Sequence, residues 1–176
     1  FNEAWYRKAP KHRENELQTI STYFHPLDGV KNWNKIYGPK GFLQYQFVVP
    51  DEASYFVRKT LQALKEVGAP SFLTVLKRFG NGTEGFLSFP MKGWTLAADV
   101  PFAVDGLLDV LNDLDDELSS CGGRLYLAKD SRQSSKTFSK TYPNLEKWIR
   151  IKSQLDPRGI FPVSYTHLTL PTIHRV

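Results

Sequence analysis

The chain has 176 residues, of which 23 are Lys or Arg and 18 are Asp or Glu, so its formal net charge is +5. Its 41% apolar and 14% aromatic residues are enough to bury a core, which excludes a disordered chain. The charges are not in blocks, which argues against a polybasic tail, and the single Cys121 excludes a disulfide framework or a Cys-x-x-Cys site.

The N-terminal segment, residues 2–23, is polar, and we expect it to be helical at most in part. A first strand is predicted over 42–49, an aromatic and β-branched run bounded by glycine and proline. A helix is predicted to begin at Asp51 and to end at Gly68, because apolar residues between them recur at three- and four-residue spacing.

Further along the chain, strands are predicted over 72–79 and 94–100. A second helix is expected to be capped by Asp105 and stopped by two glycines at 122–123. A short fourth strand follows over 124–127. The order βαββαβ predicts an α+β unit with a ferredoxin-like antiparallel sheet and both helices on one face.

The C-terminal part is predicted to contain helices over 131–141 and 144–155 and an unstructured tail over 162–176. Two of the four histidines, His167 and His174, lie in that tail without an acidic or Cys neighbour, so no metal site is predicted there. Apolar runs are far shorter than the roughly 20 residues of a membrane-spanning helix.

Residues 80–85 match the pattern G-x-G-x-x-G and follow a predicted strand. A dinucleotide-binding loop also needs a helix immediately afterwards, and residues 86–93 do not supply one. We therefore expect a flexible loop between two strands.

A ferredoxin-like sheet with aromatic residues also suggests RNA binding as an alternative function. However, residues 93–99 lack the basic Lys/Arg-Gly-aromatic run of the RNA-recognition module, so no nucleic-acid partner is predicted.

Alternation along the strands predicts one polar sheet face opposite the helices. Its expected members are Gln44 and Gln46 on the first strand, Leu73, Val75, Lys77 and Phe79 on the second, and Thr95 and Ala97 on the third. Amides donate and accept hydrogen bonds and lysine adds positive charge, so this face suits a hydroxyl-rich ligand. An ordinary solvated sheet face has the same pattern, and the pattern alone does not separate the two interpretations.

Six sequence blocks occur in an order typical of one protein family. They lie at 24–28, 32–34, 37–39, 41–50, 87–90 and 123–132, and FLQYQFVVP and GRLYLAKDSR are the most specific. From about Tyr23 to Phe161 the chain resembles the C-terminal part of decaprenylphosphoryl-β-D-ribose 2'-oxidases, flavoproteins of the vanillyl-alcohol-oxidase type.

The resemblance implies three parts: residues 1–125 as a partial substrate domain, 126–161 as the C-terminal part of the FAD-binding domain, and 162–176 as a non-native or disordered tail. The glycine-rich loops that hold the FAD pyrophosphate in the family have no counterpart in this sequence. We therefore expect a fragment that is inactive alone and does not hold FAD tightly.

The implied activity is oxidation of the 2'-hydroxyl of a polyprenylphosphoryl ribose to a ketone by hydride transfer to FAD, a step of arabinan synthesis for the cell wall. The implied partners are a short-chain reductase and, through the lipid substrate, the membrane surface. The compartment stays open between cytoplasm and cell envelope. Two alternatives remain: a sugar-lactone or sugar-alcohol oxidase of the same superfamily, and a stand-alone ferredoxin-like module that binds RNA or a small effector.

The resemblance also implies roles for individual residues. Lys129 corresponds to the catalytic lysine against the flavin, and Tyr126 to a tyrosine that contacts flavin and ligand. The implied substrate-binding residues are Gln44, Gln46, Lys77 and Thr95, with Leu27, Trp33, Leu73, Val75 and Phe79 as apolar walls. Mycobacterial members carry Asn and Cys at the positions of Thr95 and Ala97, and that Cys is the target of covalent nitroaromatic inhibitors. Ala97 therefore predicts insensitivity to covalent capture.

Overall fold

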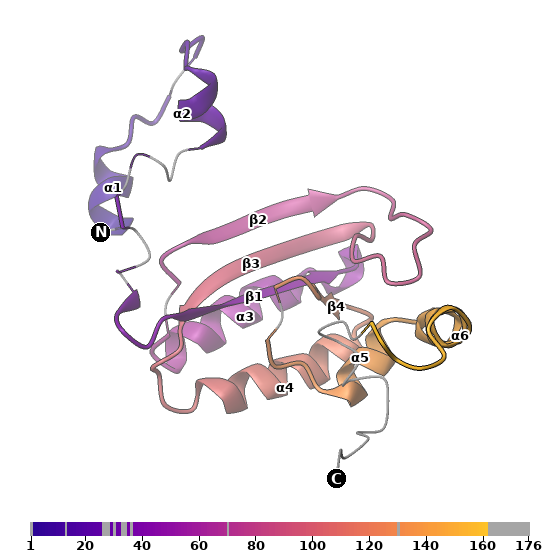
Figure 1. Ribbon diagram of the computed structural model, residues 1–176. Coiled ribbons are helices and arrows are strands. Elements are labelled where there is room, and N and C mark those ends of the chain that lie inside the picture. The colour runs from indigo at the N-terminus through magenta and orange to yellow at the C-terminus, as the bar shows by residue number, and fades with distance from the viewer. Residues whose placement is uncertain are drawn as a thin grey trace.

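An antiparallel sheet of four strands forms the centre of the protein, in the order β2-β3-β1-β4 (Figure 1). The computed structural model describes residues 2–12, 14–25, 29, 31–32, 35, 37–69, 71–129 and 131–161. The strands are β1 (Phe42–Val49), β2 (Thr74–Phe79), β3 (Gly93–Pro101) and β4 (Arg124–Leu125). The predicted strands are thus confirmed, each to within two residues at either end.

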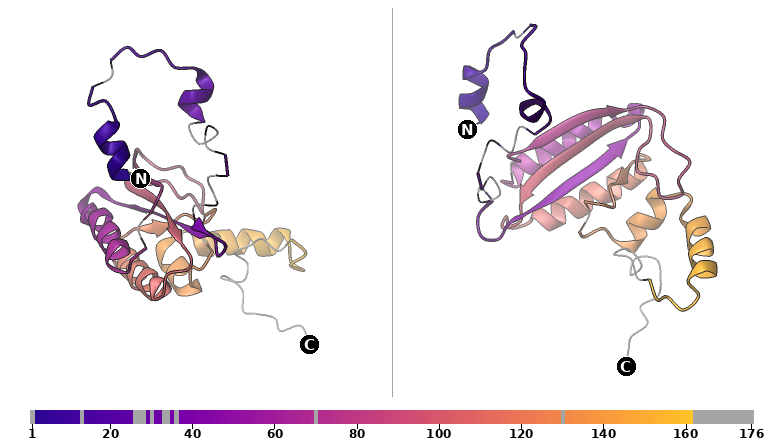
Figure 2. Two further views of the ribbon diagram at one scale, coloured as in Figure 1. Left: turned by 90° about the vertical axis from the view of Figure 1, so that its left-hand side faces the viewer. Right: turned by 45° about the horizontal axis from the view of Figure 1, so that its top comes forward.

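Two helices cover one face of this sheet, as predicted (Figures 1 and 2). They are α3 (Tyr55–Glu66), which follows the short 3₁₀ helix η3 (Asp51–Ala53), and α4 (Leu107–Ser120). Their apolar stripes meet the inward side chains of β1 and β3 in one core. The largest fully buried members of this core are Phe47, Phe56, Leu64, Leu96, Leu107, Leu111, Leu118 and Leu125.

The start of α4 corrects one prediction. Asp105 does not cap this helix; its N-cap is Gly106, with φ of 76° and no side-chain capping bond. The preceding turn closes through the Leu107 amide, which donates to the Val104 carbonyl at 3.3 Å. This turn needs a left-handed residue immediately before the helix, and glycine adopts that conformation without steric cost.

At the other end of α4, Cys121 is the C-cap and packs, half-buried, against the core. Burial raises the pKa of its thiol.

Behind β4, the chain forms α5 (Ser135–Thr141) and α6 (Leu145–Leu155), which confirms the two predicted helices, although α5 begins four residues later than expected. Ser134 fixes that start, because its side chain accepts a hydrogen bond from the Thr137 amide at 3.1 Å. These helices have a hydrophobic cluster of their own, built on Phe138, Tyr142 and Leu145. The Tyr142 hydroxyl donates to the Leu125 carbonyl at 2.5 Å and so ties this cluster to β4.

The N-terminal segment is helical in part, as predicted, with α1 (Asn2–Lys8) and α2 (Ile20–Phe24). It projects from the sheet on the side away from α3 and α4 (Figure 2). None of the helices in the described ranges is long and apolar enough to cross a membrane. The predicted tail over 162–176, and Leu27 and Trp33 among the predicted apolar walls, lie outside the described residues.

Candidate functional site

The sheet face away from α3 and α4 brings most of the predicted polar residues together. In the pairing of β1 with β3, Gln44 lies opposite Asp99 and Gln46 opposite Ala97. We call this surface the open face; its members are Phe42, Gln44, Gln46, Val48, Val75, Lys77, Phe79, Thr95, Ala97 and Asp99. Leu73 lies just before β2, where its carbonyl accepts from the Asp99 amide at 3.0 Å.

Asp99 organises one end of the open face. Asp99 is 2% exposed, and its carboxyl group accepts two hydrogen bonds, from Gln44 Nε2 at 2.7 Å and from the Tyr37 hydroxyl at 3.3 Å. Tyr37 is itself buried, with its ring stacked on Phe42 at a centroid distance of 4.2 Å. Burial, together with the charge and hydrogen bond of Asp99, raises the pKa of Tyr37 to about 12.

Neither Asp99 nor Tyr37 was predicted from the sequence as a site residue. Asp99 had a visible signal: it is an acidic residue inside an apolar strand, two positions after Ala97 and therefore on the same face. Tyr37 lies in the sequence block at 37–39, but no pattern places it beside Asp99, because it precedes the sheet in a segment without regular periodicity.

The second polar pair of the open face joins Gln46 to Thr95. Gln46 Nε2 lies 3.3 Å from Thr95 Oγ1, and that hydroxyl donates to the Phe47 carbonyl at 2.7 Å. Thr95 is 1% exposed, so its hydroxyl is enclosed by these two partners. Gln46 is only half-buried and can meet a ligand directly.

An aromatic row closes the end of the open face where β1 finishes. The rings of Phe79 and Phe89 meet edge to face at 5.9 Å, and Phe89 packs on Tyr126 at 4.5 Å. The Tyr126 amide donates to the Gln46 carbonyl at 2.9 Å, so this residue lies against β1 just after β4 ends. The row therefore gives a ligand on the glutamines an apolar wall.

Two lysines supply positive charge around this surface. Lys77 is exposed on β2, and Lys129 is half-buried in the turn after β4, where its amide donates to the Tyr126 carbonyl at 3.1 Å. Neither amino group forms an ion pair with another described residue, so both charges are available to an anionic group. The described ranges contain no cluster of His, Cys, Asp and Glu that could hold a metal.

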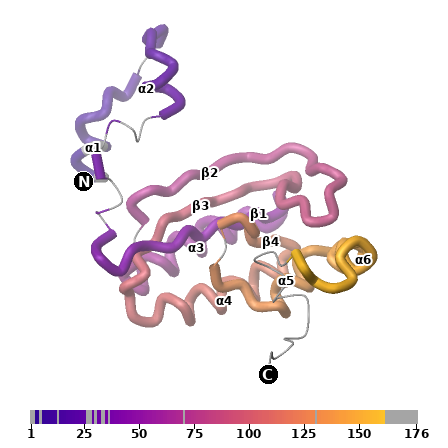
Figure 3. The backbone as a smooth tube through the Cα atoms, in the orientation of Figure 1, coloured from indigo at the N-terminus to yellow at the C-terminus, as the bar shows by residue number. Residues whose placement is uncertain are grey.

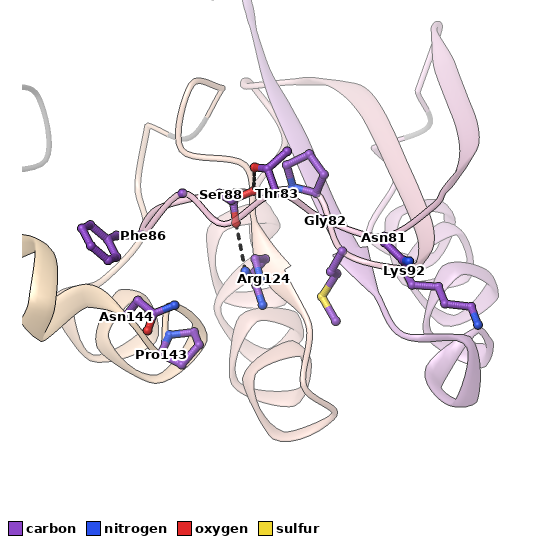
Figure 4. Close-up of a pocket in the computed structure, with 12 residues that line it drawn as sticks. Asn81, Gly82, Thr83, Phe86, Ser88, Lys92, Arg124, Pro143 and Asn144 are labelled. Atoms are coloured by element: carbon purple, nitrogen blue, oxygen red, sulfur yellow. Dashed lines mark hydrogen bonds between the residues drawn. The ribbon is translucent and has the colours of Figure 1, made fainter.

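Residues of the β2–β3 loop, Arg124, Pro143 and Asn144 line a separate pocket of about 260 Å³. The backbone trace shows that the β2–β3 loop lies at the end of the sheet where α5 and α6 also lie (Figure 3). Arg124 lies in its wall and donates to the Ser88 carbonyl at 2.9 Å (Figure 4). The Arg124 guanidinium also lies over the Tyr142 ring, 5.5 Å from its centroid. Burial lowers the pKa of this guanidinium. The glycine-rich residues 80–85 form a loop here, as predicted. Arg124 joins Ser88, which follows them in the same β2–β3 connection, to Tyr142 at the end of α5.

Comparison with known proteins matches this chain to oxidases. The family model of D-arabinono-1,4-lactone oxidase matches residues 102–168. Decaprenylphosphoryl-beta-D-ribose oxidase of Mycolicibacterium smegmatis is 45% identical over 161 residues, which are 92% of this chain and 35% of that protein. An uncharacterized protein of Streptomyces coelicolor is 31% identical over 156 residues, 89% of this chain and 42% of that protein.

These matches confirm the resemblance that the sequence blocks indicate. The chain spans about a third of the length of the first relative and about two-fifths of the second. The family match also includes residues 162–168, so it continues beyond the last of the sequence blocks.

Proposed function

From the similarity of this chain to decaprenylphosphoryl-β-D-ribose oxidase, we propose that it forms the substrate-binding part of an FAD-dependent oxidoreductase. The proposed reaction oxidises a sugar hydroxyl, the 2'-hydroxyl of a polyprenylphosphoryl ribose-like substrate, to a ketone. The observation that carries the proposal is 45% identity over 92% of the chain. A half-buried, amide-lined sheet face supports it, with two lysines nearby that form no ion pair with another described residue, because sugars are bound by such polar surfaces with apolar walls.

The proposed division places the substrate domain in residues 1–125 and the C-terminal part of the flavin domain in 126–161. Two separate hydrophobic clusters support this division, one under the sheet and one in α5 and α6. The strand order β2-β3-β1-β4, with α3 joining β1 to β2 and α4 joining β3 to β4, supports a ferredoxin-like arrangement for the first part.

Lys129 and Tyr126 are the residues proposed to meet the cofactor. They fit a flavin in that Lys129 is half-buried beside an aromatic row and its charge is not neutralised by a described acid. FAD, when bound, would supply the acceptor for the hydride that leaves the sugar carbon. Lys129 would then hold negative charge at the ring edge, and a fixed cation in a water-poor site stabilises such charge strongly.

The open face is proposed to hold the sugar itself. Gln44 and Gln46 would bind ribose hydroxyls, while Lys77, an exposed cation on the open-face side of β2, would face the phosphate. Val75 and Phe79 would form the apolar wall, with Leu73 beside them. The prenyl chain of such a substrate is the proposed link to a membrane surface, and a short-chain reductase is the proposed acceptor of the keto product.

A second candidate is oxidation of a sugar lactone or sugar alcohol, which the match to the D-arabinono-1,4-lactone oxidase model favours. The two candidates differ in the ligand group that Lys77 meets. A polyprenylphosphoryl ribose carries a phosphate, whereas the lactone is neutral. Loss of the Lys77 charge would therefore weaken binding of the first substrate far more than that of the second.

The test uses the complete FAD-loaded protein that contains this chain, under anaerobic conditions. Geranylphosphoryl-β-D-ribose is expected to bleach the flavin absorbance, and D-arabinono-1,4-lactone is expected to do so much more slowly. The reverse order of rates would favour the lactone oxidase, and no bleaching by either compound would overturn the proposal.

Lys129→Ala should slow flavin reduction by roughly 100- to 1,000-fold with an unchanged Tm, as when a fixed donor to developing negative charge is removed. The matched control is Lys140→Ala, which removes an exposed lysine of α5. Unimpaired bleaching in Lys129→Ala would contradict the role proposed for Lys129.

A further inference from the structure

Each of the two glutamines of the open face has a partner that decides which end of its amide turns outward. For Gln44 the partner is Asp99, whose carboxylate has acceptors only. The Asp99 oxygens are engaged by Gln44 at 2.7 Å and by the Tyr37 hydroxyl at 3.3 Å. Because a carboxylate cannot donate, the Gln44 nitrogen must face Asp99 and its Oε1 must turn away.

The Oε1 atom of Gln46 must also turn outward, because the hydroxyl of its partner Thr95 has only one proton to donate. The Thr95 hydroxyl has one proton, and it is directed to the Phe47 carbonyl at 2.7 Å. Toward Gln46, 3.3 Å away, Thr95 Oγ1 can therefore only accept. Gln46 must present its nitrogen to Thr95, which again leaves Oε1 as the outer atom of the amide.

The two anchors share one strand and are shielded from any ligand. Asp99 and Thr95 both lie on β3, with exposed fractions of 2% and 1%, whereas Gln44 and Gln46 are half-buried on β1. The anchors thus reach a ligand only through the glutamines. A glutamine without an anchor rotates freely and offers either a donor or an acceptor.

We propose that Asp99 and Thr95 are positioning residues that hold both amides with Oε1 outward, so that the open face selects ligand groups that donate hydrogen bonds. Sugar hydroxyls satisfy this requirement, and groups that only accept, such as fluorine or a ketone, do not. The inference rests on the proposed function for the identity of the ligand, although the orientation of the amides follows from the hydrogen bonds alone.

The first experiment tests whether a ligand hydroxyl must donate a hydrogen bond to the open face. Binding of geranylphosphoryl-β-D-ribose to the FAD-loaded protein is compared with that of its 3'- and 5'-fluoro analogues, in which fluorine replaces a hydroxyl. With Oε1 outward, at least one fluoro analogue should bind about tenfold more weakly, the size expected for one hydrogen bond to a fixed acceptor. Equal binding of the parent and both fluoro analogues would overturn the inference.

In the second experiment, the hydroxyl of Thr95 is replaced by a methyl group of similar size. Thr95→Val should raise KM for the parent about fivefold to tenfold, leave the rate of flavin reduction at saturation within about twofold, and reduce the discrimination against fluorine. Thr95→Ser keeps the hydroxyl and should restore both properties, which a purely structural effect of the substitution would not predict. Unchanged KM and discrimination in Thr95→Val would contradict the role of Thr95.

A second measurement needs no ligand and so separates the two proposals. In the same protein labelled with ¹⁵N at glutamine side-chain amides, the Nε2 protons of Gln44 and Gln46 should be protected from exchange. Asp99→Asn should change the Gln44 signal and Thr95→Val the Gln46 signal, each leaving the other in place. Rapid exchange of the Nε2 protons of both glutamines in the unsubstituted protein would contradict the inference. Protected amides without flavin reduction by any tested sugar would sink only the proposed function.

Discussion

The two faces of the sheet are built by the same strands and have opposite characters. On β1, Tyr45 and Phe47 enter the core under α3 and α4, whereas Gln44 and Gln46 lie on the open face. The covered face consists of apolar side chains in close contact, and the open face holds a network of hydrogen bonds with buried anchors. A step of one residue along the strand thus separates side chains that stabilise the fold from those that can recognise a ligand.

Each side of the sheet also has a buried aspartate, and the two have different kinds of hydrogen-bond partner. Asp115 of α4 accepts from the Tyr45 hydroxyl at 2.9 Å and pairs with Arg132 at 2.9 Å. Asp99 on the open face is held by two neutral donors, Tyr37 and Gln44. The first arrangement ties α4 to the segment before α5. The second arrangement fixes the orientation of the Gln44 side-chain amide, whose nitrogen donates to Asp99.

Replacing neighbouring residues of β1 should have the largest contrasting effects on stability. Phe47 is fully buried and meets Phe56 edge to face at 4.9 Å. Phe47→Ala should lower the free energy of unfolding by about 4 kcal/mol, because it removes an aromatic ring and leaves a cavity. Gln46→Ala should lower it by less than about 1 kcal/mol, because it loses one hydrogen bond on a half-open surface. Urea unfolding of both variants measures the difference, and similar losses would contradict the distinction between the faces.

Removing the cation beside Asp115 should have the next largest effect. The Arg132 and Asp115 side chains are 13% and 5% exposed, and Arg132 also donates to the Leu111 carbonyl at 3.0 Å. Arg132→Met should lower the free energy of unfolding by about 3 kcal/mol, because it leaves a buried carboxylate without its counter-charge.

The control for the Arg132 variant is the pair Asp115→Asn with Arg132→Met, which removes both charges. This double variant should recover part of the lost stability in urea unfolding. If it is less stable than Arg132→Met alone, packing rather than the buried charge of Asp115 accounts for the loss.

The sequence predicted the covered face better than the open one, for physical reasons. The core of β1, α3 and α4 follows from periods of 2 and 3.6 in apolar residues, which burial enforces along the whole element. The open face was predicted as a set of residues, but not as a network. Thr95 was predicted to line the substrate site, but the hydrogen bonds of its hydroxyl to Gln46 and to the Phe47 carbonyl were not. Strand register decides such contacts, and no local pattern specifies which residue of β3 lies opposite Gln44.

The prediction that Asp105 caps α4 was wrong for a different reason. Asp105 is a good cap by residue type, but the turn before the helix is closed by backbone bonds and requires the left-handed Gly106. Capping preferences describe the side chain, whereas here the backbone geometry of the preceding turn decides where the helix begins.

The smallest expected effect depends on pH and tests the neutral donors around Asp99. The pKa of Tyr37 is raised to about 12 in the folded protein, mainly by burial and then by the adjacent Asp99. An unfolded tyrosine titrates near 10, so between about pH 10 and 12 the unfolded chain loses this proton and the folded protein keeps it. The contribution of Tyr37 to stability is therefore complete below about pH 10 and falls as the pH rises toward 12.

Tyr37→Phe should cost about 1 kcal/mol at pH 8, where it removes one hydrogen bond to Asp99. The difference between the unsubstituted protein and this variant should then shrink, and reverse sign, in urea unfolding between pH 9.5 and 11.5, since phenylalanine has no proton to lose. Tyr55→Phe, which removes the hydroxyl of a tyrosine that is 55% exposed, is the control for the substitution itself. A flat difference for Tyr37→Phe would mean that its phenol is solvated, and that the Asp99 end of the open face is not the closed network from which the orientation of Gln44 follows.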